Sequence, residues 1–336
     1  MDESSPKTLS EKAKILFIQN PLNYYTLRLA FILFLCIVGA IHIYFFEEES
    51  ISFLDSLFIS TSCATGTGLQ TVSSLDLSSQ TFAVLGTCMF LGNIFLLLIP
   101  PMVARQYYNR KVLGEYKDRL NDIDPLLIEE HNLLNQALKA SIGIFTAYLL
   151  LWHILISTVI YGALLLHPNE PELEQRGYSR YQNSLFLTVA GFSNSGITIS
   201  SGGLSYWSNN PLAYFTLSLA ILAGNTCIPI FLYFTFWWLI KIYNYFRWNA
   251  ASLRFVLQNP SQISSHVLPW DATQILLYGV IIINTVQYIC FLASTAYEQV
   301  ALDTYGSMEK LAGMGYFQTI STRSAGITVS MIPQLM

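Results

Sequence analysis

The stretch CATGTGLQTV, residues 63–72, decides how this chain folds. It consists mostly of small and polar residues, yet it follows a short apolar segment at 51–59 and lies between long apolar runs at 25–46 and 81–104. Each long run can cross the roughly 30 Å hydrocarbon core of a bilayer as a helix, whereas the short segment cannot. Non-helical backbone is tolerated at that depth only where it is buried in protein or lines a water-filled cavity. The sequence therefore predicts a span, a short re-entrant helix, a polar loop and a second span.

The same layout recurs twice along the chain. The stretch GFSNSGITIS (191–200) lies between apolar runs at 137–166 and 211–243, and STRSAGITVS (321–330) follows a fifth apolar run at 272–297. Self-similarity of this kind is the signature of a repeat architecture. The pattern predicts an all-α polytopic membrane protein with two complete repeats and a partial third.

A Gly-Asn pair with a proline downstream recurs in the second span of both complete repeats, as Gly92-Asn93 and Gly224-Asn225. Its recurrence at similar places supports the repeat. The expected organisation is a cytosolic N-terminal tail (1–24), a first repeat (25–104), a cytosolic linker (105–136), a second repeat (137–243), a second cytosolic linker (244–270) and a partial third repeat (271–336).

The composition points to a lipid-embedded protein. Hydrophobic residues make up 53% of the chain and charged residues only 11%, whereas a soluble domain carries about 25% charged residues. A net charge of −4 and the lack of a basic stripe argue against nucleic-acid binding. The five cysteines lie in or beside apolar segments without CxxC spacing, so we expect buried packing residues in place of a metal site.

Lysine and arginine fall mainly in the N-terminal tail and the two linkers, which the positive-inside rule assigns to the cytoplasm. The three polar loops then lie near the outer face. The N-terminal residues lack the features of a cleaved signal peptide, so the first span is expected to be retained. This predicts a multi-pass protein of the plasma membrane with a cytoplasmic N-terminus.

Loops of this kind suit an ion path. In a pore, main-chain carbonyls replace the water shell of a permeating cation. Glycine turns its carbonyl toward the path readily because it has no Cβ, and Ser or Thr hydroxyls can brace the turn. Intramembrane catalysis would need paired ionisable groups within the spans, which the sequence lacks. A coupled carrier would place broken helices at the membrane midplane, whereas these loops follow the ends of apolar runs.

Aligned on their central glycines, the three loops resemble the filter loops of the Trk/Ktr/HKT superfamily of potassium and sodium transporters. STRSAG resembles the Thr-Arg-x-x-Gly motif of the third filter, and FSNSG resembles Phe-Asn-Asn-Ala-Gly of the second. The resemblance covers about 25–330. It implies M1–pore helix–filter loop–M2 repeats, four to a protein, around a pseudo-fourfold ion path, with no cofactor and with homodimerisation.

The resemblance also assigns site residues. The main-chain carbonyls of Gly68, Gly196 and Gly326 would contact K+ or Na+, and glycine at position 68 favours K+. Thr322 and Arg323 would support the third loop, with the arginine behind the loop and paired with a carboxylate or carbonyls. The remaining filter residues would be Thr67, Leu69, Asn194, Ser195, Ile197, Ser324, Ala325 and Ile327.

The chain departs from that family in its number of repeats. The second span of the third repeat and the whole fourth repeat are not present in the sequence. The leading interpretation is therefore part of a longer four-repeat transporter, surrounded by membrane lipid. The alternative is a shortened, non-conducting membrane subunit with a regulatory role or one completed by a partner chain.

Overall fold

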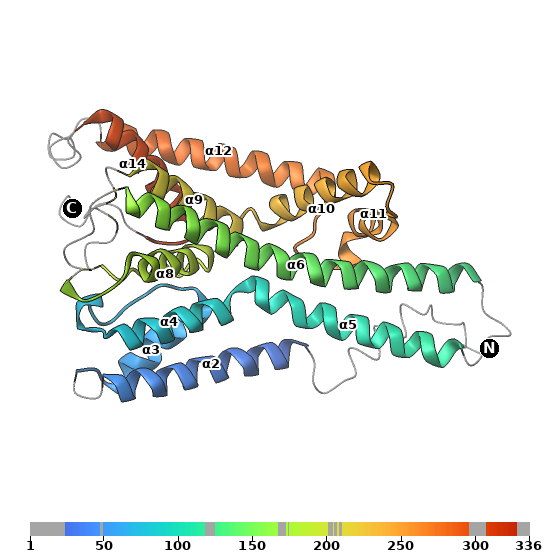
Figure 1. Ribbon diagram of the computed structural model, residues 1–336, viewed down its shortest axis with the longest axis horizontal. Helices are drawn as coiled ribbons and strands as arrows, with labels where there is room; N and C mark the ends of the chain where they lie inside the picture. Colours follow the sequence, from blue (N-terminus) through green and yellow to red (C-terminus); the bar gives the residue numbers. More distant parts are fainter. Residues whose placement is uncertain are drawn as a thin grey trace, which may run out of the picture. The chain divides into compact units, whose positions relative to one another are not determined.

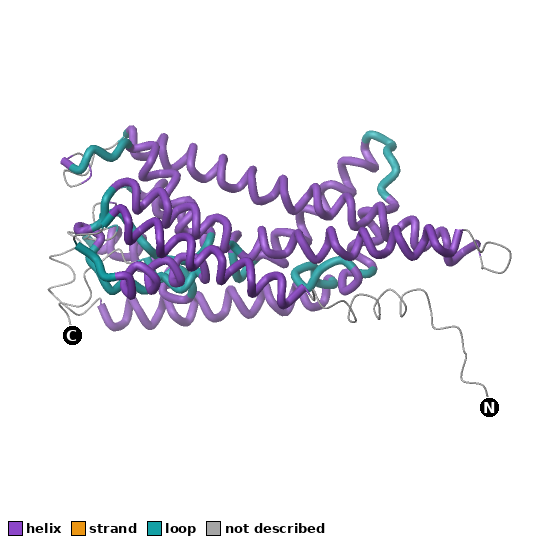
Figure 2. The backbone as a smooth tube through the Cα atoms, turned by 90° about the horizontal axis from the view of Figure 1, so that it is seen from below, coloured by secondary structure: helices purple, strands orange, loops and turns teal. Residues whose placement is uncertain are grey.

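The computed structural model describes residues 24–47, 50–117, 125–166, 173, 175–200, 204, 207, 210–295 and 307–327. Within these ranges the regular elements are helices, and no strand occurs (Figures 1 and 2). This confirms the predicted all-α fold. The N-terminal tail, up to residue 23, and the end of the partial third repeat, 328–336, lie outside the described residues.

The helices follow the predicted order of long and short segments. They are α2 (Tyr24–Phe46), α3 (Phe53–Thr65), η1 (Ser74–Asp76), α4 (Ser79–Gly92), α5 (Ile94–Lys117), α6 (Pro125–Leu165), α8 (Arg180–Phe192), α9 (Pro211–Gly224), α10 (Ile228–Tyr245), α11 (Ala251–Gln258), η3 (Pro260–Gln262), α12 (Trp270–Thr295) and α14 (Met308–Arg323).

Several of these helices are long and apolar enough to cross a membrane. In the described part of the chain they are α2, α6 and α12, and the number rises to five if the interrupted pairs α4–α5 and α9–α10 each count as one span. This confirms an integral, multi-pass membrane protein. Helices α5 and α6 also extend into the linker predicted at 105–136, and α11 and η3 occupy part of the linker predicted at 244–270.

The second span of each complete repeat is interrupted at its Gly-Asn pair. Helix α4 ends at Gly92 and α5 begins at Ile94, because Asn93 between them has an extended backbone with ψ of 137°. Helix α9 ends before Asn225, whose φ and ψ of −143° and −96° are also non-helical. Pro229 is tolerated in α10 because it stands in the first turn, where its missing N–H has no helical partner.

Contacts divide the chain into two compact units. The larger unit comprises Ile32–Ile94, Leu149–Ile228 and Gln274–Met336, and the smaller comprises Met1–Phe31, Phe95–Tyr148 and Pro229–Thr273. In the smaller unit, the Phe95 ring of α5 stacks on Tyr148 of α6 with their centroids 4.7 Å apart. Nearer the far ends of these helices, Nδ2 of buried Asn109 donates to the carbonyl of His131 at 3.3 Å.

The larger unit contains all three polar loops. Within it, α3 packs against α4, α4 against α8, α8 against α9, and α9 against α14 (Figure 1). Each short helix of the second and third repeats thus touches the second span of the repeat before it. This succession places the ends of α3, α8 and α14, where the loops begin, in one part of the unit.

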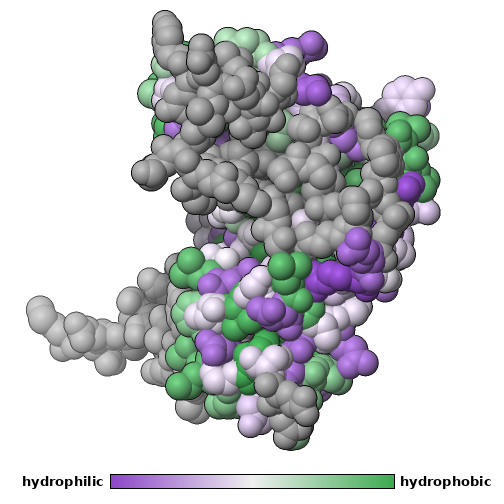
Figure 3. Space-filling view, turned by 90° about the vertical axis from the view of Figure 1, so that its left-hand side faces the viewer, coloured by the Kyte–Doolittle hydropathy of each residue, from purple (hydrophilic) through white to green (hydrophobic). Residues whose placement is uncertain are grey.

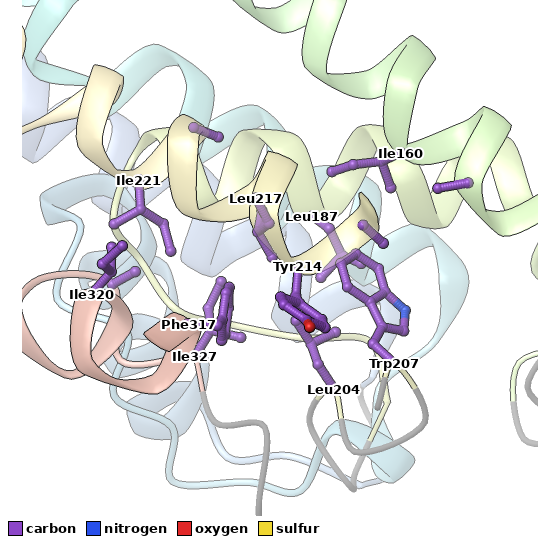
Figure 4. Close-up of a cluster of buried hydrophobic side chains, with 14 of the residues drawn as sticks. Ile160, Leu187, Leu204, Trp207, Tyr214, Leu217, Ile221, Phe317, Ile320 and Ile327 are labelled. Atoms are coloured by element: carbon purple, nitrogen blue, oxygen red, sulfur yellow. The ribbon is translucent and has the colours of Figure 1, made fainter. Parts of the chain in front are cut away.

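One hydrophobic core of the larger unit gathers around α9 and α14. Phe317 and Ile320 of α14 lie against Leu217 and Ile221 of α9 (Figure 4). Ile327, which follows the third loop glycine, belongs to the same cluster and is completely buried. The third loop is therefore anchored by apolar packing directly beyond its glycine.

The prediction that cysteines are buried packing residues is confirmed at four positions and wrong at one. Cys36, Cys63, Cys88 and Cys227 are buried, and Cys290 is exposed. Cys290 lies on α12, whose apolar segment packs little against the other described residues. All five thiols are free.

Candidate ion-filter site

The three loops share one backbone conformation at their central glycine. The φ angles are 75° at Gly68, 75° at Gly196 and 70° at Gly326. These values lie in the left-handed region, where a side chain is strained and glycine is favoured. The glycines aligned from sequence alone are therefore equivalent in three dimensions.

Each loop is closed by main-chain hydrogen bonds to the last turn of its short helix. In the first two loops, the N–H of the residue before the glycine donates to the carbonyl five residues earlier. In the third loop the glycine itself donates. The bonds are Thr67 N to Ser62 O (2.9 Å), Ser195 N to Ala190 O (3.0 Å) and Gly326 N to Ser321 O (2.7 Å).

The loops contact one another in succession through these glycines. A Cβ added to Gly68 would overlap the carbonyl oxygen of Ser195, and one added to Gly196 would overlap the carbonyl oxygen of Ala325. A Cβ added to Gly326 would have no heavy atom of the described chain within 4 Å. The absence of a side chain thus lets the first loop meet the second, and the second meet the third.

The Gly-Asn pairs lie behind the loops. A Cβ on Gly92 would overlap the carbonyl oxygen of Ala64, and one on Gly224 would overlap that of Phe192. Ala64 and Phe192 each precede a loop glycine by four residues, so the two contacts are equivalent. Asn93 also donates from Nδ2 to the carbonyl of Phe192 at 3.4 Å. Asn93 therefore forms a hydrogen bond to a neighbouring helix.

The first and second loops differ in burial. Thr67 and Leu69 are exposed, Leu69 by 59%, whereas their counterparts Ser195 and Ile197 are buried. Asn194 is buried too, and it adopts a left-handed φ of 56°, which asparagine tolerates better than most residues.

The third loop is braced by a buried hydroxyl. Ser321 Oγ donates to the carbonyl of Ile327 at 2.6 Å, across the loop that contains Ser324 and Ala325. The hydroxyl of Thr322 instead donates to a carbonyl one turn earlier in its own helix, at 2.8 Å. Ser321 therefore braces the third loop, while the Thr322 hydroxyl bonds within α14.

The guanidinium of Arg323 is largely enclosed. Its Nε and Nη2 atoms are buried and have no hydrogen-bond acceptor among the residues that the structure describes. The expected carboxylate or carbonyl partner of Arg323 is therefore not found within the described ranges.

Three residues near the loops were not predicted from the sequence. Ser195 Oγ donates to the sulfur of Met89 in α4. Beyond the first loop, Arg176 donates to the carbonyl of Leu77, and Glu47 accepts from the N–H of Ser78. Arg176 is one of the few cations on the side predicted to face outward, and this was the one signal that could have pointed to it, whereas Met89 resembles any core methionine.

The chemistry available in these loops is that of carbonyls and hydroxyls. Across the described ranges, no group of three or more His, Cys, Asp or Glu side chains could hold a metal ion. Hydrophilic side chains appear beside hydrophobic ones on the face shown in Figure 3. The carbonyl and hydroxyl oxygens of the loops can bind and release a weakly held monovalent cation, for which carbonyl oxygens are suitable ligands.

Comparison with known proteins identifies the family. Residues 35–336 match the family model described as "TrkH: Cation transport protein". The chain belongs to the TrkH cation transport protein family. This agrees with the resemblance to the Trk/Ktr/HKT superfamily and with the expectation of a membrane transporter in place of an enzyme.

Curated relatives of this TrkH-family chain come from plants and fungi. It is 25% identical over 289 residues to the cation transporter HKT2;4 of Oryza sativa subsp. japonica, covering 82% of this chain and 56% of the relative. It is 24% identical over 362 residues to the rice cation transporter HKT1;3, covering 99% and 67%. It is 25% identical over 201 residues to the low-affinity potassium transport protein of Saccharomyces cerevisiae, covering 60% and 22%. The chain thus spans at most about two thirds of these relatives.

Proposed function

We propose that this chain forms part of a filter that conducts K+, or Na+ as the alternative cation, across a membrane as part of a longer four-repeat transporter. The main-chain carbonyls around Gly68, Gly196 and Gly326 would replace the hydration shell of the ion. The observation that carries the proposal is the shared left-handed conformation of these three glycines, with each of the first two packed against the next loop.

The fourth wall of this filter would come from a segment beyond the described residues. Gly68 and Gly196 each face the carbonyl that precedes the next loop glycine, whereas the corresponding space beside Gly326 holds no described atom. A fourth loop offering its own carbonyl there would continue the succession. If the chain is instead a subunit completed by a partner chain, the space beside Gly326 would be open to a loop of that partner.

Ion choice is expected to depend on Gly68. Replacing it with serine would place Cβ where the Ser195 carbonyl lies, so the first two loops would have to separate. We expect Gly68→Ser to reduce the preference for K+ over Na+ by about tenfold, equivalent to about 1.4 kcal/mol in relative binding free energy. Reversal potentials of the full-length protein, normalised to surface abundance, would measure this.

The matched control is Gly162→Ala in α6, where an added Cβ meets no described atom within 4 Å. Its ion preference should equal that of the wild type. An unchanged K+/Na+ preference in a Gly68→Ser protein that reaches the membrane would show that the first loop is not part of the filter.

The finer topology also belongs to this proposal. We place the N-terminus and both linkers in the cytoplasm, the three loops toward the outside, and the protein in the plasma membrane as a homodimer. Labelling of single introduced cysteines by an impermeant reagent would test the orientation. Position 69 should react from outside, since Leu69 is exposed on the first loop.

A further inference from the structure

Arg176 joins the segments that leave the first two filter loops. It precedes α8, and its guanidinium donates to three main-chain carbonyls. Nη1 donates to Ile199 at 3.0 Å, and Nη2 donates to Ser74 at 3.0 Å and to Leu77 at 2.7 Å. Ile199 lies three residues after Gly196, while the other two acceptors follow the first loop. One side chain therefore connects two repeats on the far side of their filter glycines.

The guanidinium is held by aromatic rings as well. Its Cζ lies 5.7 Å from the centroid of the Phe82 ring and 5.3 Å from that of Tyr178. These two rings meet edge to face with centroids 6.0 Å apart. Cation–π attraction and charge-assisted hydrogen bonds both strengthen when they are partly shielded from water. Arginine suits this place because its planar fork can serve several acceptors at once, which a lysine ammonium cannot reproduce.

An acidic residue holds the same peptide from its other side. The carbonyl of Leu77 accepts from Arg176, and the N–H of the next residue, Ser78, donates to Oε1 of Glu47 at 2.6 Å. Glu47 is buried, and its Oε1 also accepts from the hydroxyl of Thr81 at 2.7 Å. The Leu77–Ser78 peptide is therefore bound at its oxygen by a cation and at its nitrogen by an anion.

A second connection runs parallel to the first. Ser74 Oγ donates to the carbonyl of Thr198 at 2.9 Å. Thr198 follows Gly196 by two residues, so this bond also ties the segment after the first loop to the segment after the second. Two adjacent acceptors beyond Gly196, at 198 and 199, are thus held by residues outside the second loop.

From this geometry, and resting on the proposed filter function, we propose that Arg176 is a positioning residue that fixes the separation of the first and second filter loops and thereby the choice between K+ and Na+. Glu47 and Ser74 complete the connection. Discrimination between the two ions depends on how carbonyls are placed and how far they can relax. Loosening the connection should let the loops adjust to the smaller ion.

The test uses the full-length protein in cells that lack their own K+ uptake, with reversal potentials normalised to surface abundance. Arg176→Gln should lower the K+/Na+ permeability ratio by about threefold or more. Arg176→Lys, which keeps the charge but not the fork, should fall between Gln and the wild type. Ser74→Ala, which removes one connecting bond, should change the ratio in the same direction by less.

Arg180→Gln is the matched control, because Arg180 lies four residues further on, at the start of α8, and should leave the ratio unchanged. Wild-type ratios in Ser74→Ala and Arg176→Lys proteins at the surface would overturn the positioning role, even if Arg176→Gln fails to fold. If Gly68→Ser still shifts the ratio in that case, the proposed filter stands. If Gly68→Ser is also without effect, the filter and the positioning role both fail.

Discussion

Asn93 and Phe192 are 99 residues apart in the sequence, and the Asn93 side chain donates a hydrogen bond to the Phe192 carbonyl at 3.4 Å. The bond joins the interruption in the second span of one repeat to the last residue of the short helix in the next. Gly224 approaches the same carbonyl from the second span of its own repeat. The end of α8, where the second polar loop begins, is thus held by two spans.

Removing this hydrogen bond should weaken the larger unit. Asn93→Leu has a similar volume but no donor, and interhelical hydrogen bonds in membranes contribute about 0.6 kcal/mol on average. We expect a lower melting temperature of the purified protein in detergent. Thr87→Val is the control, because the Thr87 hydroxyl is exposed and bonds only within its own helix, to the carbonyl of Ala83. Equal losses in the two variants would contradict a special role for Asn93.

The two interrupted spans should be intolerant of alanine at their glycines. Gly92→Ala and Gly224→Ala would each drive a methyl group into a main-chain carbonyl, and overpacking of this kind costs about 1–3 kcal/mol or more. Folded yield and thermal stability should fall for both. Gly162→Ala should be neutral or stabilising, since alanine is the better helix former and nothing in the described chain opposes its methyl group.

The third loop should depend on Ser321 more than on Thr322. Ser321→Ala leaves the buried carbonyl of Ile327 without its hydroxyl donor, which costs about 1–3 kcal/mol. We expect reduced cation uptake per molecule at the surface. Thr322→Val removes a bond within α14 only and should retain uptake. The reverse order of severity would restore Thr322 as the residue that braces the loop.

The start of α3 should respond to acid. Ser52 caps this helix, and its hydroxyl donates to Oδ2 of Asp55 at 2.5 Å. This hydrogen bond is the main cause that lowers the pKa of the Asp55 carboxyl below its usual 3.8, with the Thr71 hydroxyl acting in the same direction. Because the folded-state pKa is depressed, the ionised Asp55 carboxylate stabilises the folded state above the usual pKa of 3.8. This stabilisation is lost as the pH falls through the lower, folded-state pKa.

The comparison of wild type with Asp55→Asn measures this effect. The wild type should melt at a higher temperature at about pH 6, and the difference should shrink as the pH falls below 3.8 and the carboxylate becomes protonated. A difference that stays constant across this range would mean that the charge of Asp55 plays no part in capping α3.

Much of the fold follows from the sequence because lipid imposes simple rules. Apolar runs long enough to span, short segments that are not, and small residues after them led directly to α2, α3, α6, α12 and α14. The shared conformation of Gly68, Gly196 and Gly326 followed from aligning three short motifs. These are local patterns, and local patterns can be read from one chain.

The contacts between repeats could not be predicted in this way. Arg176 is one cation in a polar loop, and nothing near it in the sequence indicates that its acceptors lie about 100 residues earlier, at Ser74 and Leu77. The hydropathy of the spans at 81–104 and 211–243 is unbroken, so it does not show where their helices are interrupted. At both interruptions a glycine, Gly92 or Gly224, packs closely against a carbonyl of another helix, and such a contact cannot be read from hydropathy.

The contacts of the loop glycines run in one direction along the chain, from the first loop to the third. The glycine of one loop is complementary to the carbonyl before the glycine of the next loop, and not to any group of its own. The three loops are therefore not interchangeable. A residue change at position 68 constrains position 195, and one at 196 constrains 325, so chimeras between relatives should work only when neighbouring loops are transplanted together and in their original order.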